Sequence, residues 1–308
     1  MNRARFLPVF AALALAGCAA DFDPGSDVAS LRVLAVQADR PFAHPGETVQ
    51  LQALSYDPLD RPLTWAWAAC PNPSSSSVGD CFDQVGTIAA AGDTPLLALG
   101  VGTDHVQLTI PRDALDGFPE NTRSQALSGV LSVACPGDLA LGESHNGLPF
   151  RCTDPKSGAE LDLHDMVVGV KRVFLRETDI NSNPVIAQVL FDGEDWAPDD
   201  IKQVGACDTD GHDYDKCKGA DHHQIAAIVS PDSFEAGLDE LGHSFSEEVI
   251  VQHYATNGIF KDEVRLASAP ETSWVATQSA SGSTRTLWFV ARDDRGGVAW
   301  TSRQVQVE

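Results

Sequence analysis

The sequence predicts an all-β protein of two tandem antiparallel β-sandwiches, which follow a cleaved targeting segment. Two observations predict this class. Short segments with alternating apolar and polar residues recur along the chain, and loops rich in Gly, Pro, Ser and Asp separate them. The length of 308 residues is sufficient for two domains of ordinary size.

Residues 1–17 are predicted to be a signal peptide. Two arginines precede a short apolar run, which is too short to span a bilayer as a helix. The run ends in Leu15-Ala16-Gly17-Cys18, which resembles the lipobox of bacterial lipoproteins. The resemblance implies cleavage before Cys18 and acylation of Cys18. A plain signal peptide with an incidental Cys18 is the alternative.

Residues 18–29 are small, acidic and turn-prone, and we expect them to form a lipidated tether. In the enterobacterial sorting rule, an Asp after the lipidated cysteine retains a lipoprotein on the inner membrane. Ala19 therefore indicates the outer membrane, with the protein facing the periplasm or the cell surface. Two or three acyl chains hold a protein firmly, so a membrane is one expected partner. The formal net charge of −23 argues against nucleic acid as another, because phosphate binding requires clustered Lys and Arg.

The chain has seven cysteines, an odd number, and lipidation of Cys18 leaves six for disulfides in an oxidising compartment. Their spacing favours three local disulfides, Cys70–Cys81, Cys135–Cys152 and Cys207–Cys217. A zinc site shared by neighbouring cysteines is the alternative, but the sequence contains no CxxC motif.

The first sandwich is predicted to occupy residues 30–180. Its expected strands are, in order, 31–38, 48–56, 63–70, 104–110, 129–135 and 166–176, with a short helix within 113–127. Trp65 and Trp67 are two residues apart on one strand, so they share a face. Core packing is the main interpretation of this pair, and an exposed carbohydrate-stacking platform is the alternative.

Strand order also bears on the disulfides. If 63–70 and 129–135 are antiparallel neighbours, Cys70 and Cys135 lie at opposite ends of the sheet. A strand of seven residues is about 23 Å long, whereas the Cα atoms of a disulfide lie within about 7 Å. A Cys70–Cys135 disulfide is therefore not expected.

The second sandwich is predicted to occupy residues 181–308. Its expected strands are 183–193, 224–230, 247–256 and 262–268, followed by a hairpin over 285–307 whose DDRGG turn carries paired glycines. An acidic insert bounded by cysteines is expected at about 197–223. Trp288 and Phe289 point to opposite faces of their strand, so one of them is expected at the surface or at the domain junction.

Parts of both units resemble the Ig-like and PKD-type modules of bacterial surface proteins. In GETVQLQALSYDPLDRPLTWAW (46–67), a strand is followed by an Asp-containing turn and a strand that carries Trp, as in that family. VIVQHYATNGIF (249–260) takes the place of the Trp-bearing strand in the second unit, and TLWFVARDDRGGVAW (286–300) is similar to the family's last two strands. The resemblance implies Ig-like sandwiches that serve as an extracytoplasmic scaffold or binding module, and it carries over no catalytic residue.

The most chemically suggestive segment is CDTDGHDYDKCKGADHH, residues 207–223. Alternating carboxylates in a glycine-containing loop can supply the oxygen ligands that Ca²⁺ prefers. The candidate calcium ligands are Asp208, Asp210, Asp213 and Asp215. A solvated acidic loop without any ligand is the main alternative, and a transition-metal site would use His212, His222 and His223.

Catalytic signatures such as GxSxG, HExxH, a P-loop or a dinucleotide fingerprint do not occur in the sequence. The adjacent acid pairs Glu247-Glu248 and Asp293-Asp294 would face opposite ways on strands, which suits turns better than paired acid–base work. We therefore expect a non-enzymatic scaffold, adhesion or binding module, whose partner is an envelope protein or a polysaccharide. The alternative is a glycan-active envelope enzyme that uses loop carboxylates.

Overall fold

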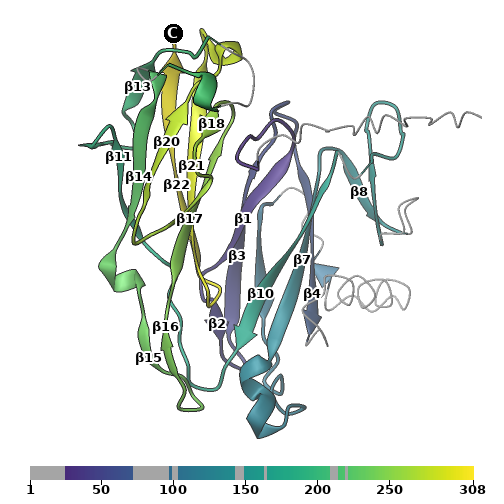
Figure 1. The fold of residues 1–308 in the computed structure, drawn as a ribbon. Coiled ribbons are helices and arrows are strands. Elements are labelled where there is room, and N and C mark those ends of the chain that lie inside the picture. Colours follow the sequence, from purple (N-terminus) through teal and green to yellow (C-terminus); the bar gives the residue numbers. More distant parts are fainter. Residues whose placement is uncertain are drawn as a thin grey trace, which may run out of the picture.

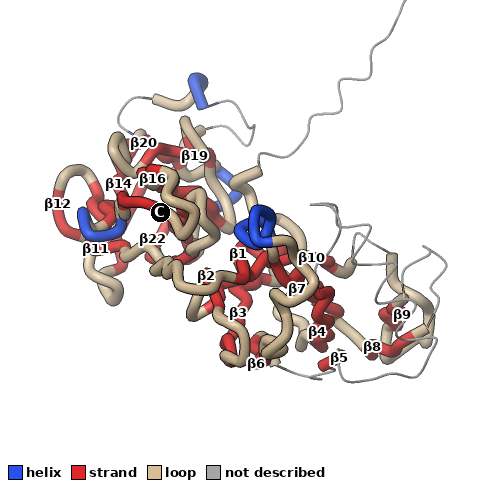
Figure 2. The backbone as a smooth tube through the Cα atoms, turned by 90° about the horizontal axis from the view of Figure 1, so that it is seen from below, coloured by secondary structure: helices blue, strands red, loops and turns tan. Residues whose placement is uncertain are grey.

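The computed structural model describes residues 25–71, 97–98, 103–142, 149–162, 165–208, 214–218 and 221–308. The described chain is almost entirely β, as predicted, and its strands form two Ig-like sandwiches (Figure 1). The sandwiches lie side by side. Seen from below, their strands form two groups, with β1 and β2 on the side of the first group that faces the second (Figure 2).

The first sandwich has sheets of three and five strands. Its three-stranded sheet has the order β1-β3-β6, formed by Arg32–Ala38, Thr48–Tyr56 and His105–Thr109. The second sheet has the order β2-β10-β7-β4-β5, formed by Phe42–Ala43, Val167–Leu175, Leu127–Cys135, Thr64–Pro71 and Leu97–Ala98. Strand β2 pairs parallel with β10, so the first strand segment contributes to both sheets. All other pairings in these two sheets are antiparallel.

Trp65 and Trp67 confirm the core interpretation and exclude the exposed platform. Their rings stack with centroids 5.6 Å apart and an angle of 13° between the ring planes. The exposed fractions of the two residues are 3% and 1%. Alternate residues of β3 point to the same core, because the side chains of a strand alternate between its two faces.

The second sandwich contains two five-stranded sheets. One has the order β12-β11-β14-β20-β18, formed by Glu194–Asp195, Ile186–Phe191, His223–Val229, Glu271–Val275 and Ile259–Phe260. The other has the order β13-β22-β21-β17-β19, formed by Ile201–Val204, Val298–Val307, Thr284–Asp293, Val249–Ala255 and Val264–Leu266. The predicted final hairpin is confirmed as β21 and β22, which pair antiparallel over nine residue pairs.

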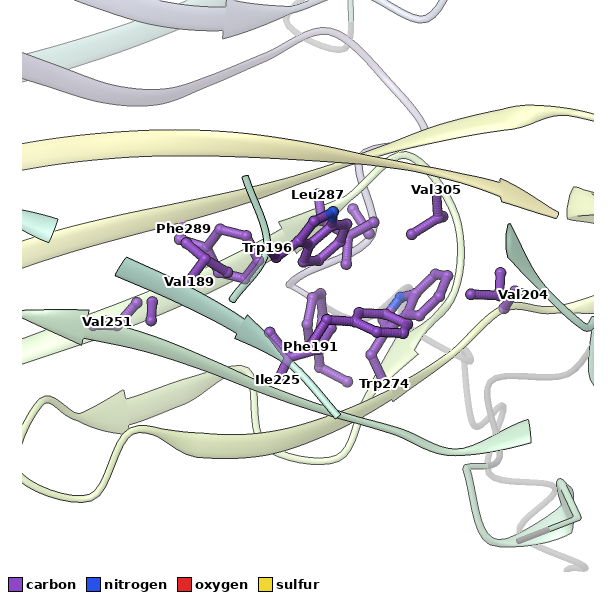
Figure 3. Close-up of a cluster of buried hydrophobic side chains, with 14 of the residues drawn as sticks. Val189, Phe191, Trp196, Val204, Ile225, Val251, Trp274, Leu287, Phe289 and Val305 are labelled. Carbon is purple, nitrogen blue, oxygen red and sulfur yellow. The ribbon is translucent and has the colours of Figure 1, made fainter. Parts of the chain in front are cut away.

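Besides the two-residue strands β12 and β18, strands β13 and β20 of the second sandwich lie outside the segments that the sequence predicted as strands. Residues 201–204 were expected within the acidic insert, but they form β13, which pairs parallel with β22. Strand β20 was not expected at all, although its Trp274 lies in the core with Trp196 and Phe289 (Figure 3). Both strands are short and take their partners from distant parts of the chain, so local patterning gives little signal for them.

Smaller elements decorate the sandwiches. Two hairpins are inserted between strands, one formed by β8 (Asp138–Leu141) and β9 (Phe150–Thr153), the other by β15 (Ala236–Leu238) and β16 (Ser244–Ser246). The short helix expected within 113–127 is a 3₁₀ helix. The described 3₁₀ helices are η1 (Glu120–Gln125), η2 (Tyr214–Lys216), η4 (Pro231–Ser233) and η5 (Gln278–Ala280). None of the described helices is both long and apolar enough to cross a membrane.

Two of the expected local disulfides are present. Cys135–Cys152 joins β7 to β9, and Cys207–Cys217 joins the chain after β13 to the residue that follows η2, with Cα–Cα distances of 5.8 and 5.3 Å. Cys81 lies outside the described residues, so Cys70–Cys81 stays a prediction. Cys70 is paired in register with Gly129, at the opposite end of the β4–β7 pair from Cys135, as the strand assignment requires.

The chain that enters the first sandwich is bound to the second one. Val28 donates its backbone N–H to the Ala255 carbonyl at 2.9 Å, and the Ala255 N–H donates to the Ser26 carbonyl at 2.8 Å. Val28 is also buried, with an exposed fraction of 1%. The last part of the expected tether, residues 25–29, is therefore attached to the end of β17, which was not foreseen from sequence.

The outer face of β17, β21 and β22 is covered by the first sandwich. Trp288 packs against Tyr56 with ring centroids 5.1 Å apart, and Val28 and Leu34 complete this cluster. A second cluster at the junction contains Ala35, Val290 and Val298, with Leu54, Tyr254 and Trp300 packed against it. Phe289 points the other way, into the core of the second sandwich. The sequence expectation that one of Trp288 and Phe289 lies at the junction is confirmed.

Replacing Trp288 with Ala tests how strongly this contact couples the sandwiches. We expect a loss of about 3–5 kcal/mol in the free energy of unfolding, because a buried Trp side chain is removed. We also expect one calorimetric transition to separate into two. Phe234→Ala, at an aromatic residue that is 37% exposed, is the control and should change the stability by less than about 0.5 kcal/mol. A single unchanged transition in Trp288→Ala would contradict the coupling.

Candidate functional site: a charged groove at the domain junction

Charged residues gather where β10 of the first sandwich meets the turn between β21 and β22. This turn requires glycine, because Gly296 has φ of 102° and a Cβ there would lie 2.9 Å from the Phe174 ring. One carboxylate oxygen of Asp293 accepts the backbone N–H groups of Arg295 and Gly297, at 2.9 and 2.7 Å. The DDRGG sequence thus forms a turn that points its own charged residues at the first sandwich.

Lys171, on β10, is the most deeply placed cation of this region. It has an exposed fraction of 8%, and its Nζ donates to the Gly296 carbonyl at 2.5 Å. Burial lowers the pKa of Lys171 to about 8, and the positive charge of Arg292 acts in the same direction. The carboxylate of Asp293 opposes both effects. Lys171 therefore connects the two sandwiches through this hydrogen bond, although the partial desolvation of its charge is unfavourable.

Further hydrogen bonds cross the junction beside the apolar clusters. Arg292 donates from Nη2 to the Leu34 carbonyl at 2.7 Å. Asn183, in the segment that links the sandwiches, donates to the Ala38 carbonyl at 2.7 Å and accepts the Val298 N–H at 2.8 Å. These bonds end on backbone groups, so they fix the relative position of strands and not only of side chains.

Glu247 and Asp293 meet in one buried cluster with Arg295. The guanidinium of Arg295 lies 3.1 Å from the Glu247 carboxylate and 3.6 Å from that of Glu235. Burial raises the pKa of Glu247 to about 7, and the negative charges of Asp293 and Glu235 raise it further against the effect of Arg295. Burial also raises the pKa of Asp293.

The sequence interpretation of the two acid pairs was incomplete. It considered the residues within Glu247-Glu248 and within Asp293-Asp294, which would face opposite ways on strands, whereas one residue from each pair enters the same cluster. The register explains this, since β17 pairs with β21 so that Val249 lies opposite Asp293. Spacing along the chain carries no signal for such a meeting; only a correct strand register would have revealed it.

Two arginines alternate with three phenylalanine rings along this edge of the junction. Arg295 lies over Phe245 at 3.9 Å and over Phe42 at 4.7 Å, measured from the guanidinium carbon to the ring centroid. Arg176 lies over the other neighbours in the row, Phe42 at 4.6 Å and Phe174 at 5.3 Å. Phe42 thus contacts one arginine from each sandwich, and such cation–π contacts strengthen when they are desolvated.

Two cavities open along this row and share Phe174 and Asp294. The first has a volume of about 320 Å³ and the second of about 290 Å³. The first is lined by Val170, Lys171, Arg172, Phe174, Asp293, Asp294 and Gly296. The second is lined by Phe42, Ser124, Phe174, Arg176, Asp179, Asp239, Phe245, Asp294 and Arg295. We call the two together the junction groove. Its lining offers charges of both signs for binding a polar ligand or partner.

The structure brings together only part of the expected calcium loop. Asp208 forms an ion pair with Lys218, and Asp215 lies in η2. Asp210, Asp213 and His212 lie outside the described residues. In the part of the chain that the structure describes, no three His, Cys, Asp or Glu side chains are placed to hold a metal ion. The calcium site stays a prediction.

The two expected transition-metal histidines that are described have other contacts. The His222 ring stacks on Tyr214 with centroids 4.4 Å apart. His223 stacks on Phe191, and its Nδ1 lies 2.9 Å from a carboxylate oxygen of Asp192.

Comparisons with known proteins leave the function open. No family model and no curated protein matches the chain. Solved structures similar to it include tandem Ig repeats of Dlar, at 8% identity over 90% of this chain and 97% of that one with a TM-score of 0.26. The D0-D1 domain of intimin aligns at 10% identity over 89% and 98%, with a TM-score of 0.22. A nucleoside hydrolase-related hypothetical protein from Saccharophagus degradans aligns at 13% identity and a TM-score of 0.25, where 42% of this chain covers 26% of that one.

The raised pKa of Glu247 predicts a junction that becomes more stable on acidification. The folded state holds the Glu247 proton up to about pH 7, whereas the unfolded chain releases it near 4.5, so this group adds stability as pH falls from 7 to 4.5. His253 acts in the opposite sense, because burial lowers its pKa to about 4. The test therefore compares the free energies of unfolding of the wild type and a Glu247 variant, because both contain His253 and its contribution cancels. Relative to Glu247→Gln, we expect the wild type to gain up to about 3 kcal/mol in urea unfolding between pH 8 and pH 4.5.

Glu248→Gln is the matched control, since Glu248 is adjacent in sequence but exposed. This variant should follow the wild type at every pH. A constant difference between wild type and Glu247→Gln across the range would show that Glu247 titrates normally.

Proposed function

We propose that the protein is a lipid-anchored lipoprotein of the bacterial cell envelope that acts as a non-enzymatic binding and scaffold module. The lipobox-like sequence at Cys18 supports the anchor. The observation that carries the binding role is the junction groove, which residues of both sandwiches line. Its partner in this proposal is an envelope protein or a polysaccharide, and the anchoring membrane is the outer membrane.

The fixed junction supports a module that presents its groove in one orientation. The hydrogen bonds of Arg292, Asn183 and Lys171 accompany two apolar clusters between the sandwiches. Interfaces of this kind oppose the relative motion that is otherwise expected between domains of one chain. A groove lined by both sandwiches keeps its shape only if their relative position is kept.

The position of the N-terminal segment supports an outward-facing groove. The segment is bound at Ala255, at one end of β17, whereas Glu247 and the groove residues lie beyond the other end. The length of β17 separates these ends by roughly 20 Å. Only six residues stand between Cys18 and Gly25, and they reach at most roughly 25 Å. With an anchor at Cys18, this reach supports an orientation in which the Ala255 end faces the membrane and the groove points away from it.

Cys18→Ser tests the anchor. We expect the variant to leave the membrane fraction and to remain unprocessed, because the thiol that accepts the lipid is lost. Cys207→Ser is the control, since it removes a different cysteine and should stay membrane-bound. Fractionation followed by immunoblotting measures both. Unchanged membrane association of Cys18→Ser would refute the lipoprotein proposal.

A further inference from the structure

Arg176 is a buried cation at the edge of the second cavity of the junction groove. Its exposed fraction is 9%, and its Nη1 donates to the carbonyls of Ala126 and Leu175 at 3.3 and 2.7 Å. Among the described residues, no carboxylate forms an ion pair with it, and its Nε and Nη2 have no hydrogen-bond partner. Buried charges are costly unless they are paired. The two aromatic rings that enclose Arg176 hold it in place. The negative charges of Glu240, Asp179 and Asp239 act on it through space, but none of them contacts its guanidinium in an ion pair among the described residues.

The other charges that line this cavity fall into two groups. Arg295 and Asp239 are already satisfied, Arg295 by Glu247 and Glu235, and Asp239 by the N–H groups of its own turn. Asp179 and Asp294 are not: within the described ranges neither forms an ion pair, and Asp294 accepts only a long hydrogen bond of 3.4 Å from the Glu248 N–H. The cavity thus presents one cation, Arg176, and two carboxylates, Asp179 and Asp294, that form no ion pair within the described ranges, although Asp179 lies near enough to Arg176 to act on its charge.

This charge pattern selects a ligand of mixed charge. A simple anion would meet Arg176 but also the two carboxylates, and a simple cation would meet the carboxylates but also Arg176. Like charges in a partly desolvated site are repulsive, so each of these ligands loses part of what it gains. A small molecule that carries a carboxylate and an ammonium group can satisfy both sides. The volume of about 290 Å³ lies at the lower end of ligand cavities, which also favours a small molecule.

We propose that the second cavity of the junction groove binds the α-amino-carboxylate group of an amino acid, with its carboxylate on Arg176 and its ammonium beside Asp179 and Asp294. The planar guanidinium can donate two parallel hydrogen bonds to a carboxylate. Ser124, also in the lining, offers a hydroxyl to either group. The proposal names a ligand class for the binding role proposed above, but it does not depend on the lipid anchor.

The site draws on three parts of the chain. Arg176 and Ser124 belong to the first sandwich, Asp294 belongs to the second, and Asp179 belongs to the segment between them. A ligand that contacts all three parts binds only when the sandwiches are docked. Binding to the folded state alone raises its stability with ligand concentration, so the melting temperature reports on the site.

The test uses the intact chain purified in detergent, and measures binding by isothermal titration calorimetry together with thermal melting. The probes are L-alanine, L-leucine, L-lysine and L-glutamate. The tightest of them is then compared with its two halves, the analogue without the amine and the analogue without the carboxylate; for alanine these are propionate and ethylamine. We expect each half to bind at least about tenfold more weakly, because it loses one charge-assisted contact.

Variants at exposed or half-buried positions keep the test independent of folding. We expect Asp294→Asn and Asp179→Asn to weaken amino acid binding at least about tenfold and to leave the amine-free analogue unaffected or tighter. Asp199→Asn, at an exposed carboxylate outside the groove, is the matched control and should bind as the parent does. Arg176→Lys keeps the charge but loses the planar guanidinium, so its affinity should also fall.

Three results would overturn the proposal. The first is the absence of both binding heat and a shift in melting temperature with any of the four amino acids up to about 10 mM. A dissociation constant above that concentration would be too weak to be useful. The second is an amine-free analogue that binds as tightly as the amino acid, which would make the cavity an anion site only. The third is equal loss of binding in Asp294→Asn and Asp199→Asn, which would mean a general charge effect. None of these results bears on the membrane fractionation of Cys18→Ser, so the two proposals fail separately.

Discussion

The burial of Trp288 on the outer face of the second sandwich is the contact on which the rest of the molecule depends. A sheet in a sandwich normally has one apolar face and one solvated face, but here β21 carries large apolar residues on both. The outer set is covered only if the first sandwich docks, through Leu34, Ala35 and Tyr56. Docking then brings Lys171 and Phe42 against the β21–β22 turn, and the junction groove arises from that approach.

Charges at the junction are held at some energetic cost. Lys171 and Glu247 are desolvated, and ionised groups that leave water repay the loss only when their partners are well placed. Apolar residues of similar volume would stabilise such a position more simply. The presence of Arg176, Arg295, Glu247 and Asp293 in one region therefore agrees with a binding surface better than with a purely structural contact.

Much of the fold is predictable from the sequence, because alternating patterns and turn residues are local signals. The final hairpin, the shared core face of Trp65 and Trp67, and the placement of one of Trp288 and Phe289 at the surface or the junction all follow from the two-residue period of a strand. Strands β13 and β20 were not predicted, because they are short and are defined by distant partners. The charged groove was not predicted for the same reason. Glu247, Asp293 and Lys171 are remote in sequence and meet only through strand register and domain docking, neither of which leaves a local pattern.

The backbone pairing between Ser26, Val28 and Ala255 constrains the order in which the molecule can be completed. The two sides of this pairing are separated by more than 220 residues of chain, and contacts of such long sequence separation form late because loop closure must come first. Because synthesis of the chain begins at the N-terminus, β1 and its neighbours are available long before β17. The N-terminal segment can therefore pair with Ala255 only after β17 has been synthesised, so this pairing depends on the second sandwich and ties the start of the chain to it.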